Sequence, residues 1–313
     1  MPAFGTANDL LLAHIIEATT GVTPANPVMD RLRVAGETLG PRIMYDEAAE
    51  INPLYALADL VGVGSEAGGA FPYDFAKSAA MDDIMQAVLR GTWTAGVLKG
   101  GTVKRSYTLE KSVLAGTGGR KYMKFPGSRY MGFSLTGSVG SRMTGSVDVM
   151  SLSGIPSGAS VVGTGSVTEP ADNRILSMVD ISALSMTGDV TPLIARGFTL
   201  SVNNNGRYQQ GHGQLASFDI AYGMREVTFS IDAYFESWEQ MDKLLNRSNS
   251  NLQMTLGDGT NSYVIRLPRL RYRTLDANAT GNNADLIQTI EGRGLYDPTV
   301  GVVTDIMITR TPA

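Results

Sequence analysis

Two stretches of this 313-residue chain carry the same pattern, Pro-x-x-Arg-Tyr, as "PGSRY" at residues 126–130 and "PRLRY" at 268–272. A helix-like segment precedes each of them, "SAAMDDIMQAVLRG" in the first half and "SWEQMDKLLNRS" in the second. The registers agree, because Phe75 and Phe235 each lie six residues before a Met, at Met81 and Met241. This order predicts a duplicated unit of strands, one helix, a hairpin and a closing pair of strands.

The two helical segments show the usual signals for a start and a stop. Ser78 is placed to cap the first, Asp82 and Asp83 favour its first turn, and Gly91 suits its end. Ser237 is the expected cap of the second helix, and Trp238 lies on its apolar stripe. We therefore expect two short helices, with Trp238 on a buried face.

Strand patterns follow each helix. The segment "LQMTLGDGTNSYVIRLP" predicts a hairpin that turns at Asp258-Gly259, and its counterpart in the first half has a longer Gly-rich turn at 115–119. Alternation at Val227, Phe229 and Ile231 predicts another strand. Because proline cannot donate to a ladder, Pro126 and Pro268 predict an edge strand or a bulge. The 36 glycines also favour many short strands with tight turns.

The domain boundaries follow from these segments. Residues 1–40 are expected to form an N-terminal arm, with a short helix in "TANDLLLAHIIEA". Residues 41–153 and 174–313 are the two expected domains, and the Gly- and Ser-rich stretch 154–173 between them reads as a linker or a mobile loop.

Composition excludes several classes of function. The absence of cysteine removes disulfides, thiolate metal sites and cysteine nucleophiles. A net charge of −4 gives no reason to expect binding to nucleic-acid phosphates. No apolar run reaches the roughly 18 residues of a membrane span, and no signal peptide is evident. The expectation is a soluble protein made in a reducing compartment.

No group of residues predicts catalysis. His14 and His212 are expected to be solvated or in turns, and "GVGSEAGG" at 62–69 is expected to be a turn between strands. The acidic pairs Asp46-Glu47 and Asp82-Asp83 need no acid–base role, since the second opens a helix. The arginines of "RLPRLRYR" alternate in direction along a strand and so do not form one patch, which predicts inter-subunit salt bridges or a solvated face. We therefore predict no catalytic, cofactor-binding or metal-binding residues.

The chain resembles the major tail tube proteins of long, non-contractile-tailed bacteriophages over nearly its whole length. The resemblance is carried by Glu17-x-x-x-Gly21-x-Thr23-Pro24, by "RSYTLEK" at 105–111 and by "TGSV" at 144–147. It continues in "LSVNNNG", in the long segment from "VTFSIDAYFE" to "RLPRLRY", and in "IMITR". The chain departs from its relatives at "KFPGSRY", where they more often read Phe-Thr-Gly-Cys-x-Val.

The resemblance implies a mainly β fold with short helices, a sandwich whose strands join between subunits into a lumenal β-barrel. It implies a structural virion protein, assembled in the bacterial host cytoplasm, that stacks as rings into a tube for DNA delivery. Two domains in one chain would make a homotrimer a pseudo-hexameric ring. The implied partners are the chain itself and the tape measure, tail terminator and distal tail proteins. Double-stranded DNA would pass without specific binding, with no cofactor and no membrane.

Two other interpretations remain open from the sequence. The first is the tube protein of a contractile or secretion-type apparatus, although such proteins are usually nearer half this length. The second is a β-rich enzyme or carbohydrate-binding module, which would need an acid pair or an exposed aromatic platform.

Overall fold

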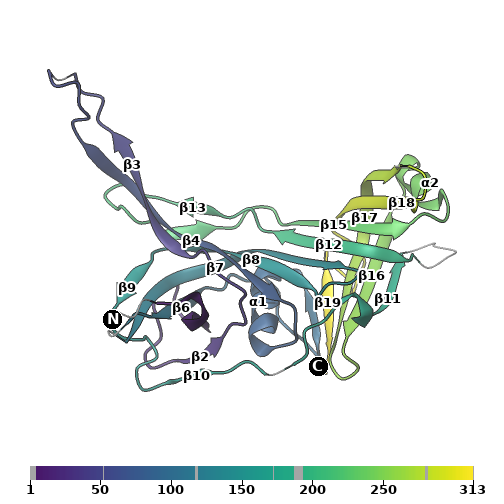
Figure 1. Ribbon diagram of the computed structural model, residues 1–313, viewed down its shortest axis with the longest axis horizontal. Coiled ribbons are helices and arrows are strands. Elements are labelled where there is room, and N and C mark those ends of the chain that lie inside the picture. Colours follow the sequence, from purple (N-terminus) through teal and green to yellow (C-terminus); the bar gives the residue numbers. More distant parts are fainter. Residues whose placement is uncertain are drawn as a thin grey trace.

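The computed structural model describes residues 5–51, 53–116, 119–171, 173–186, 193–278 and 281–312, and strands dominate it (Figure 1). The expected mainly β fold with short helices is confirmed. The described helices are α1 (Ala79–Leu89) and α2 (Glu239–Leu245), with short 3-10 turns η1 (Ala7–Asp9) and η3 (Met178–Asp180). Neither α-helix is long and apolar enough to cross a membrane.

Eight of the described strands join into one continuous antiparallel sheet, which we call the long sheet. Its order is β3–β4–β8–β7–β12–β15–β18–β17. The strands are β3 (Gly40–Glu47), β4 (Leu60–Asp74), β7 (Arg120–Ser138), β8 (Thr144–Ser151), β12 (Ala195–Asn203), β15 (Glu226–Tyr234), β17 (Ser262–Ala277) and β18 (Ile287–Gly294). Only the C-terminal halves of β7 and β17 belong to it, because their N-terminal halves pair elsewhere.

Two smaller sheets lie beneath the long sheet, one built mainly from each half of the chain (Figure 1). The first runs β10–β2–β1–β6–β7–β9 and the second β11–β16–β17–β19–β5. Their strands are β1 (Leu11–Ile16), β2 (Val28–Arg31), β5 (Val97–Lys99), β6 (Tyr107–Leu114), β9 (Ile155–Ser157), β10 (Ser166–Thr168), β11 (Ile181–Met186), β16 (Ser250–Gly257) and β19 (Met307–Thr311). Core side chains fill the space between the layers.

The two halves repeat one set of pairings. In the first half β1 pairs with β6, β3 with β4, β4 with β8, and β7 with β6, β8 and β9. In the second half β11, β12, β15, β16, β17, β18 and β19 pair in the same way. Each helix follows the second long-sheet strand of its half. The repeated motif order is thus matched by a repeated order of pairing.

The Pro-x-x-Arg-Tyr pattern lies where β7 and β17 pass from a lower sheet into the long sheet. Between Phe125 and Ser128, β7 takes three steps while β6 takes two, and β17 does the same against β16 between Leu267 and Leu270. A second bulge follows the tyrosine of each pattern. The bulge expected from the two prolines is confirmed, and it turns each long strand from one layer to the other.

Helix α1 matches its sequence signals, whereas α2 does not match all of them. The Ser78 hydroxyl accepts a hydrogen bond from the Met81 N–H, and α1 ends at the left-handed residue Arg90, one position before the expected Gly91. In α2 the cap is Trp238 rather than Ser237. The expectation that Trp238 is buried is wrong, since 56% of its surface is exposed. It packs edge-on against Phe235 at the outer end of the molecule instead.

The N-terminal region differs from the helix expected there. After η1, the segment Leu11–Ile16 is strand β1, which pairs with β6 on one side and β2 on the other. Leu12 and Met29 are fully buried, so this region lies within the fold rather than extending from it. The run "LLAHII" has too little polar contrast to separate helical from strand periodicity, and the pairing with distant β6 decides its structure.

Two further segments carry strands where turns or loops were expected. Residues 62–69 belong to β4, which pairs with β3 and β8. A Cβ at Gly68 or Gly69 would lie 2.4 Å from a carbonyl oxygen of a neighbouring segment, so no other residue fits there. Both glycines have φ near +150°, which other residues rarely adopt. The stretch 154–173 includes β9 and β10, which pair with β7 and β2.

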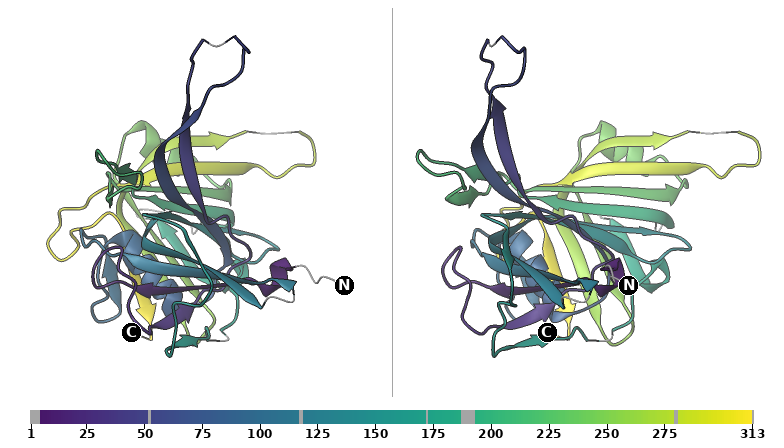
Figure 2. Two further views of the ribbon diagram at one scale, coloured as in Figure 1. Left: turned by 90° about the vertical axis from the view of Figure 1, so that its left-hand side faces the viewer. Right: turned by 60° about the vertical axis from the view of Figure 1, so that its left-hand side comes forward.

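The β3–β4 hairpin extends far beyond the body of the molecule (Figures 1 and 2). A second hairpin, β13 (Arg207–Gln209) with β14 (Asp219–Ala221), lies against its base. The Ser65 N–H donates to the Leu215 carbonyl at 2.8 Å, and the Tyr208 hydroxyl donates to the Ala67 carbonyl. A segment of the second half therefore braces the projecting hairpin of the first.

Candidate functional site

The long sheet ends in two edges without a partner strand. Among the described residues, β3 pairs with β4 alone, and residues 273–277 of β17 pair with β18 alone. Unpaired edges present rows of N–H and C=O groups that readily bind another chain. These two edges are the first candidate surface.

The outer face of the long sheet is polar and rich in hydroxyls. Its alternate residues point away from the core and include Ser134, Thr136, Thr199, Ser201, Thr228, Ser230, Asp232, Thr289 and Glu291. Charges on this face have partners: Asp232 accepts from the Thr289 hydroxyl at 2.6 Å, and Glu291 accepts from the Thr274 hydroxyl at 2.7 Å. The outer face is therefore polar, and these two acidic side chains are hydrogen-bonded to neighbouring hydroxyls.

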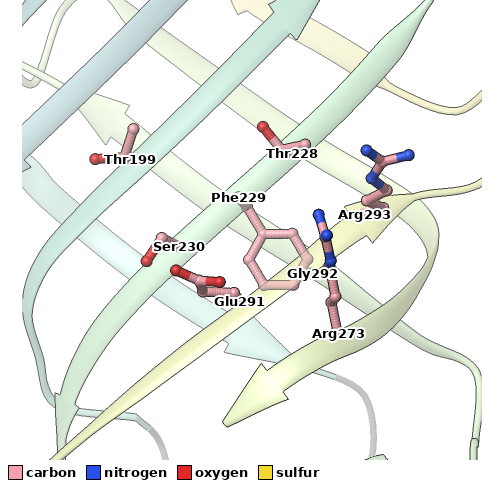
Figure 3. Close-up of a pocket in the computed structure, with 8 residues that line it drawn as sticks. All are labelled: Thr199, Thr228, Phe229, Ser230, Arg273, Glu291, Gly292 and Arg293. Atoms are coloured by element: carbon pink, nitrogen blue, oxygen red, sulfur yellow. The ribbon is translucent and has the colours of Figure 1, made fainter. Parts of the chain in front are cut away.

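A hollow of about 230 Å³ lies on the polar face and is lined by residues of β12, β15, β17 and β18 (Figure 3). Within it, Phe229 on β15 faces Gly292 on β18, and the Phe229 ring fills the space that a Cβ on Gly292 would need. Arg273 and Arg293 lie on one side of this ring and Glu291 on the other. Of the arginines in "RLPRLRYR", Arg273 lines the hollow. Arg269 does not line it and donates a hydrogen bond to the Tyr296 carbonyl at 3.4 Å. The hollow has no histidine, no acid pair and no tryptophan among its lining residues.

The projecting hairpin exposes an unusual number of large apolar side chains. Ile51, Leu54 and Tyr55 at its tip expose 84% or more of their surface. Along its strands, exposed side chains include Ile43, Tyr45, Leu60, Val61 and Val63. The acidic pair Asp46-Glu47 also lies here, at the end of β3. An apolar surface of this extent on one element is typical of an interface.

Glu17 joins three of the motifs in the first half. Its carboxylate accepts from the Gly21 N–H at 2.8 Å, the Thr108 hydroxyl at 2.7 Å and the Gly127 N–H at 2.9 Å. Gly127 lies in the bulge of "PGSRY", and Thr108 lies in "RSYTLEK". Glu17 itself is buried, so its role is to hold the bulge and the preceding turn together.

The two histidines have different environments. His212 is exposed in a turn, as expected. His14 is 1% exposed, so the expectation that it is solvated or in a turn is wrong. Burial lowers the pKa of His14 to about 4. Its strand β1 is sandwiched between β2 and β6, and its ring stacks on Tyr107 with centroids 5.4 Å apart.

The two acids that open α1 also differ from each other. Asp82 accepts from the Tyr263 hydroxyl at 2.7 Å and from Arg310 Nη1 at 2.5 Å, which ties α1 to β17 and β19 of the second half. Asp83 faces the first half, and burial, with Asp30 and Asp82 nearby, raises its pKa to about 6. These contacts go beyond the helix-dipole role expected for the pair.

The structure brings together residues that the sequence treated separately. Edge strands, the Glu17 contacts and the group around His14 all join positions far apart in the chain. Glu17 and Thr108 stood within quoted motifs, but no spacing rule linked them. Nothing in the sequence marked the polar face, because its residues alternate with core positions on eight strands.

Comparison with known proteins identifies the family. The family model described as "Phage tail tube protein" matches residues 7–294, well over half of the chain. A search among curated proteins finds no match at the required significance. Together with the β-rich fold, the match shows that this chain belongs to the phage tail tube proteins, which are structural virion components rather than enzymes.

Proposed function

We propose that this chain is the tube subunit of a long, non-contractile tail, and that three chains close a ring. Residues 41–153 and 174–313 would each supply one tube-like domain, with residues 11–39 built into the first. Family membership implies assembly into a tube and contact with other tail components. The observation that carries the ring proposal is the pair of free edges on the long sheet.

The two free edges are the counterparts of the two strands that join the halves. Within the chain, β7 of the first half pairs with β12 of the second. By the repeated pairings, β17 corresponds to β7 and β3 corresponds to β12. If β17 of one chain pairs with β3 of the next, every junction around the ring is the same. Such a head-to-tail contact closes when the rotation permits.

The internal junction also gives the register of the proposed contact. Ser134 on β7 faces Ser201 on β12. Counting from the bulge that follows the tyrosine of each strand, Ser134 on β7 corresponds to Asp276 on β17. By the repeated pairings, Ser201 on β12 corresponds to Gly40 on β3. Gly40 of one chain should therefore face Asp276 of its neighbour, and Arg42 should face Thr274.

The polar face of the long sheet would line the lumen. Its core side is filled by packed side chains, and its other side carries Ser, Thr and balanced charges. A surface without a basic excess gives DNA no counterion release to gain, so DNA could slide past. The tape measure, tail terminator and distal tail proteins are the other proposed partners.

The projecting β3–β4 hairpin would make the contact between stacked rings. Residues 1–40, the expected N-terminal arm, are less suited to this contact, because β1 and β2 are integral to the first lower sheet. The hairpin carries the exposed apolar surface instead, and we assign its cover to a second copy of this chain in the next ring. Deletion of residues 49–58 should leave folded chains that fail to stack into tubes.

Disulfide cross-linking tests the register directly, because the chain has no native cysteine. The double variants Gly40→Cys/Asp276→Cys and Arg42→Cys/Thr274→Cys place thiols on residues that should face each other between chains. Facing residues on paired strands have Cα atoms about 4.5–5.5 Å apart, within disulfide reach. Oxidised assemblies should give covalent dimers and closed trimers on denaturing gels.

The matched control is a register shifted by two, Arg42→Cys/Asp276→Cys, where the side chains are diagonal neighbours. It should cross-link much less than the facing pairs. Equal cross-linking of all three variants, or ladders that extend past trimers to hexamers, would overturn the proposed register or the ring of three.

A further inference from the structure

A polar cluster inside the first half brings together three residues from three elements. His14 lies on β1 and faces Asp30 on β2 as its cross-strand neighbour, and Asp83 reaches them from α1. One ligand atom from each residue lies within 4.8 Å of the other two. His14 is almost wholly buried, while the two carboxylates are half-buried.

The His14 ring has one occupied nitrogen and one without a partner. Nδ1 lies 2.6 Å from the Tyr130 hydroxyl. Nε2 is buried and has no hydrogen-bond partner among the described residues. A buried ring nitrogen is costly to leave unpaired. In the tautomer with the proton on Nδ1, this N–H donates a hydrogen bond to the Tyr130 hydroxyl, and the Nε2 lone pair is free to bind a cation, the arrangement typical of metal-binding histidines.

The two carboxylates increase the need for a positive charge. Both are half-buried and lie beside each other in the cluster, where two carboxylates repel each other. Arg105 and Arg310 lie nearby. Their hydrogen bonds go to other groups, since Arg105 Nη2 donates to Thr92 and Arg310 Nη1 donates to Asp82. Tyr107 and Tyr130 complete the surroundings and are neutral.

We propose that His14 Nε2, Asp30 and Asp83 bind one divalent transition-metal ion, with Zn²⁺ the best match. One imidazole and two carboxylates form a mixed N/O set that suits Zn²⁺, with water completing the coordination. Ligand atoms on a tetrahedral ion lie about 3.4 Å apart, so small side-chain rotations would bring the three into place. The ion would fasten β1 and β2 to α1.

The site is independent of the proposed ring, because it lies within one half and away from both free edges. Its role is to stabilise the subunit: an ion that binds only the folded chain raises the unfolding temperature. No matching cluster lies among the residues of the second half that the structure describes, and Met186 occupies the position that corresponds to His14.

The test is zinc binding by the full chain after treatment with a chelator. Titration calorimetry with ZnCl₂ and metal analysis after dialysis should give one equivalent per chain, together with a higher unfolding temperature. Asp30→Asn and Asp83→Asn should each weaken zinc binding at least tenfold and abolish the temperature shift. Tyr130→Phe should weaken binding 10- to 100-fold, since it removes the group that orients His14.

The matched control is His212→Gln, which removes the exposed histidine and should change neither the stoichiometry nor the shift. Co²⁺ bound to the wild-type chain gives a second readout, because its visible absorption reports N/O coordination. This readout remains usable even if one Asn variant folds poorly. Failure of the wild-type chain to bind Zn²⁺ or Co²⁺ would overturn the proposal. So would binding that survives both Asn variants or disappears in His212→Gln.

Discussion

The first and second halves share one framework but fill it differently. In each half, the tyrosine of Pro-x-x-Arg-Tyr directs its hydroxyl at a side chain of a lower-sheet strand, which is β1 in the first half and β11 in the second. Tyr130 contacts His14 Nδ1 at 2.6 Å, and Tyr272 contacts Met186 Sδ at 3.2 Å. The shared part is therefore the bulge and its tyrosine anchor, whereas the ionisable cluster is found, within the described parts of the chain, in the first half.

The helices differ in the same way. Helix α1 is buried, and Asp82 links it to the second half, whereas α2 lies at one end with Asp242 exposed at the corresponding position. The repeated pairings therefore define the long sheet in both halves, whereas a helix aspartate that bonds to the other half is found in the first half and not at the corresponding position of the second. The predictions below test that division.

The largest difference is expected between the two helix aspartates. Asp82→Ala should destabilise the chain by about 4 kcal/mol, because it leaves Arg310 and the buried Tyr263 hydroxyl without their partner. Asp242→Ala should change stability by less than about 0.5 kcal/mol, as for other exposed sites. Urea unfolding of both variants measures this, and equal losses would break the proposed asymmetry.

The next largest effect concerns how each bulge is held. Glu17→Ala should cost about 3 kcal/mol, because Gly21, Thr108 and Gly127 all lose a charged acceptor. In the corresponding bulge of β17, Arg269→Ala removes only a long hydrogen bond to the Tyr296 carbonyl and should cost about 1 kcal/mol. Thermal unfolding compares the two, and a smaller loss in Glu17→Ala than in Arg269→Ala would contradict this account.

The tyrosine anchors should have similar energies. Tyr130→Phe and Tyr272→Phe should each cost about 1.5 kcal/mol, since each removes a buried hydroxyl bonded to its neighbours. Chemical denaturation without metal is the measurement. If one variant were neutral and the other severe, the two tyrosines would not be equivalent anchors.

The smallest effects are opposed pH dependences within the first half. The pKa of His14 is about 4 in the folded chain, below its ordinary value of 6.5, so folding favours the neutral ring. The free energy of unfolding should therefore decrease as pH falls from 6.5 towards 4. The raised pKa of Asp83, about 6, means that stability from protonated Asp83 is lost as pH rises from 4 through 6.

Single variants separate these contributions in metal-free protein. Relative to wild type, His14→Gln should gain stability as pH falls, and Asp83→Asn should gain stability as pH rises. Urea midpoints at pH 4, 5, 6 and 7 give both slopes. Parallel slopes for the two variants would show that the charges facing them, from Asp30, Asp82, Arg105 and Arg310, dominate their titration.

Local signals in the sequence predicted what local physics controls. The cap at Ser78, the turn at Asp258-Gly259 and the bulges at Pro126 and Pro268 depend on neighbouring residues, and all are confirmed. Strand β1 was mistaken for a helix because a distant strand, β6, determines its pairing. Gly68 and Gly69 suggest a turn in the sequence, because the carbonyl oxygens that leave no space for a side chain at these positions belong to other segments.

Prediction of the candidate sites from the sequence was harder than prediction of the fold, because the sites depend on contacts between distant residues. His14, Asp30 and Asp83 lie on two strands and a helix, so no sequence spacing could group them. The exposure of Trp238 depends on how far α2 extends past β17. The two free edges became visible only once the order of the long sheet was known.

The most direct test of the central claim is cryo-electron microscopy of assembled tubes at a resolution that separates strands. The account predicts rings of three chains in which β17 of one chain pairs with β3 of the next, with Gly40 facing Asp276. Each such junction should superpose on the internal β7–β12 junction. Rings of six chains, or a β3 edge that faces no β17, would contradict it.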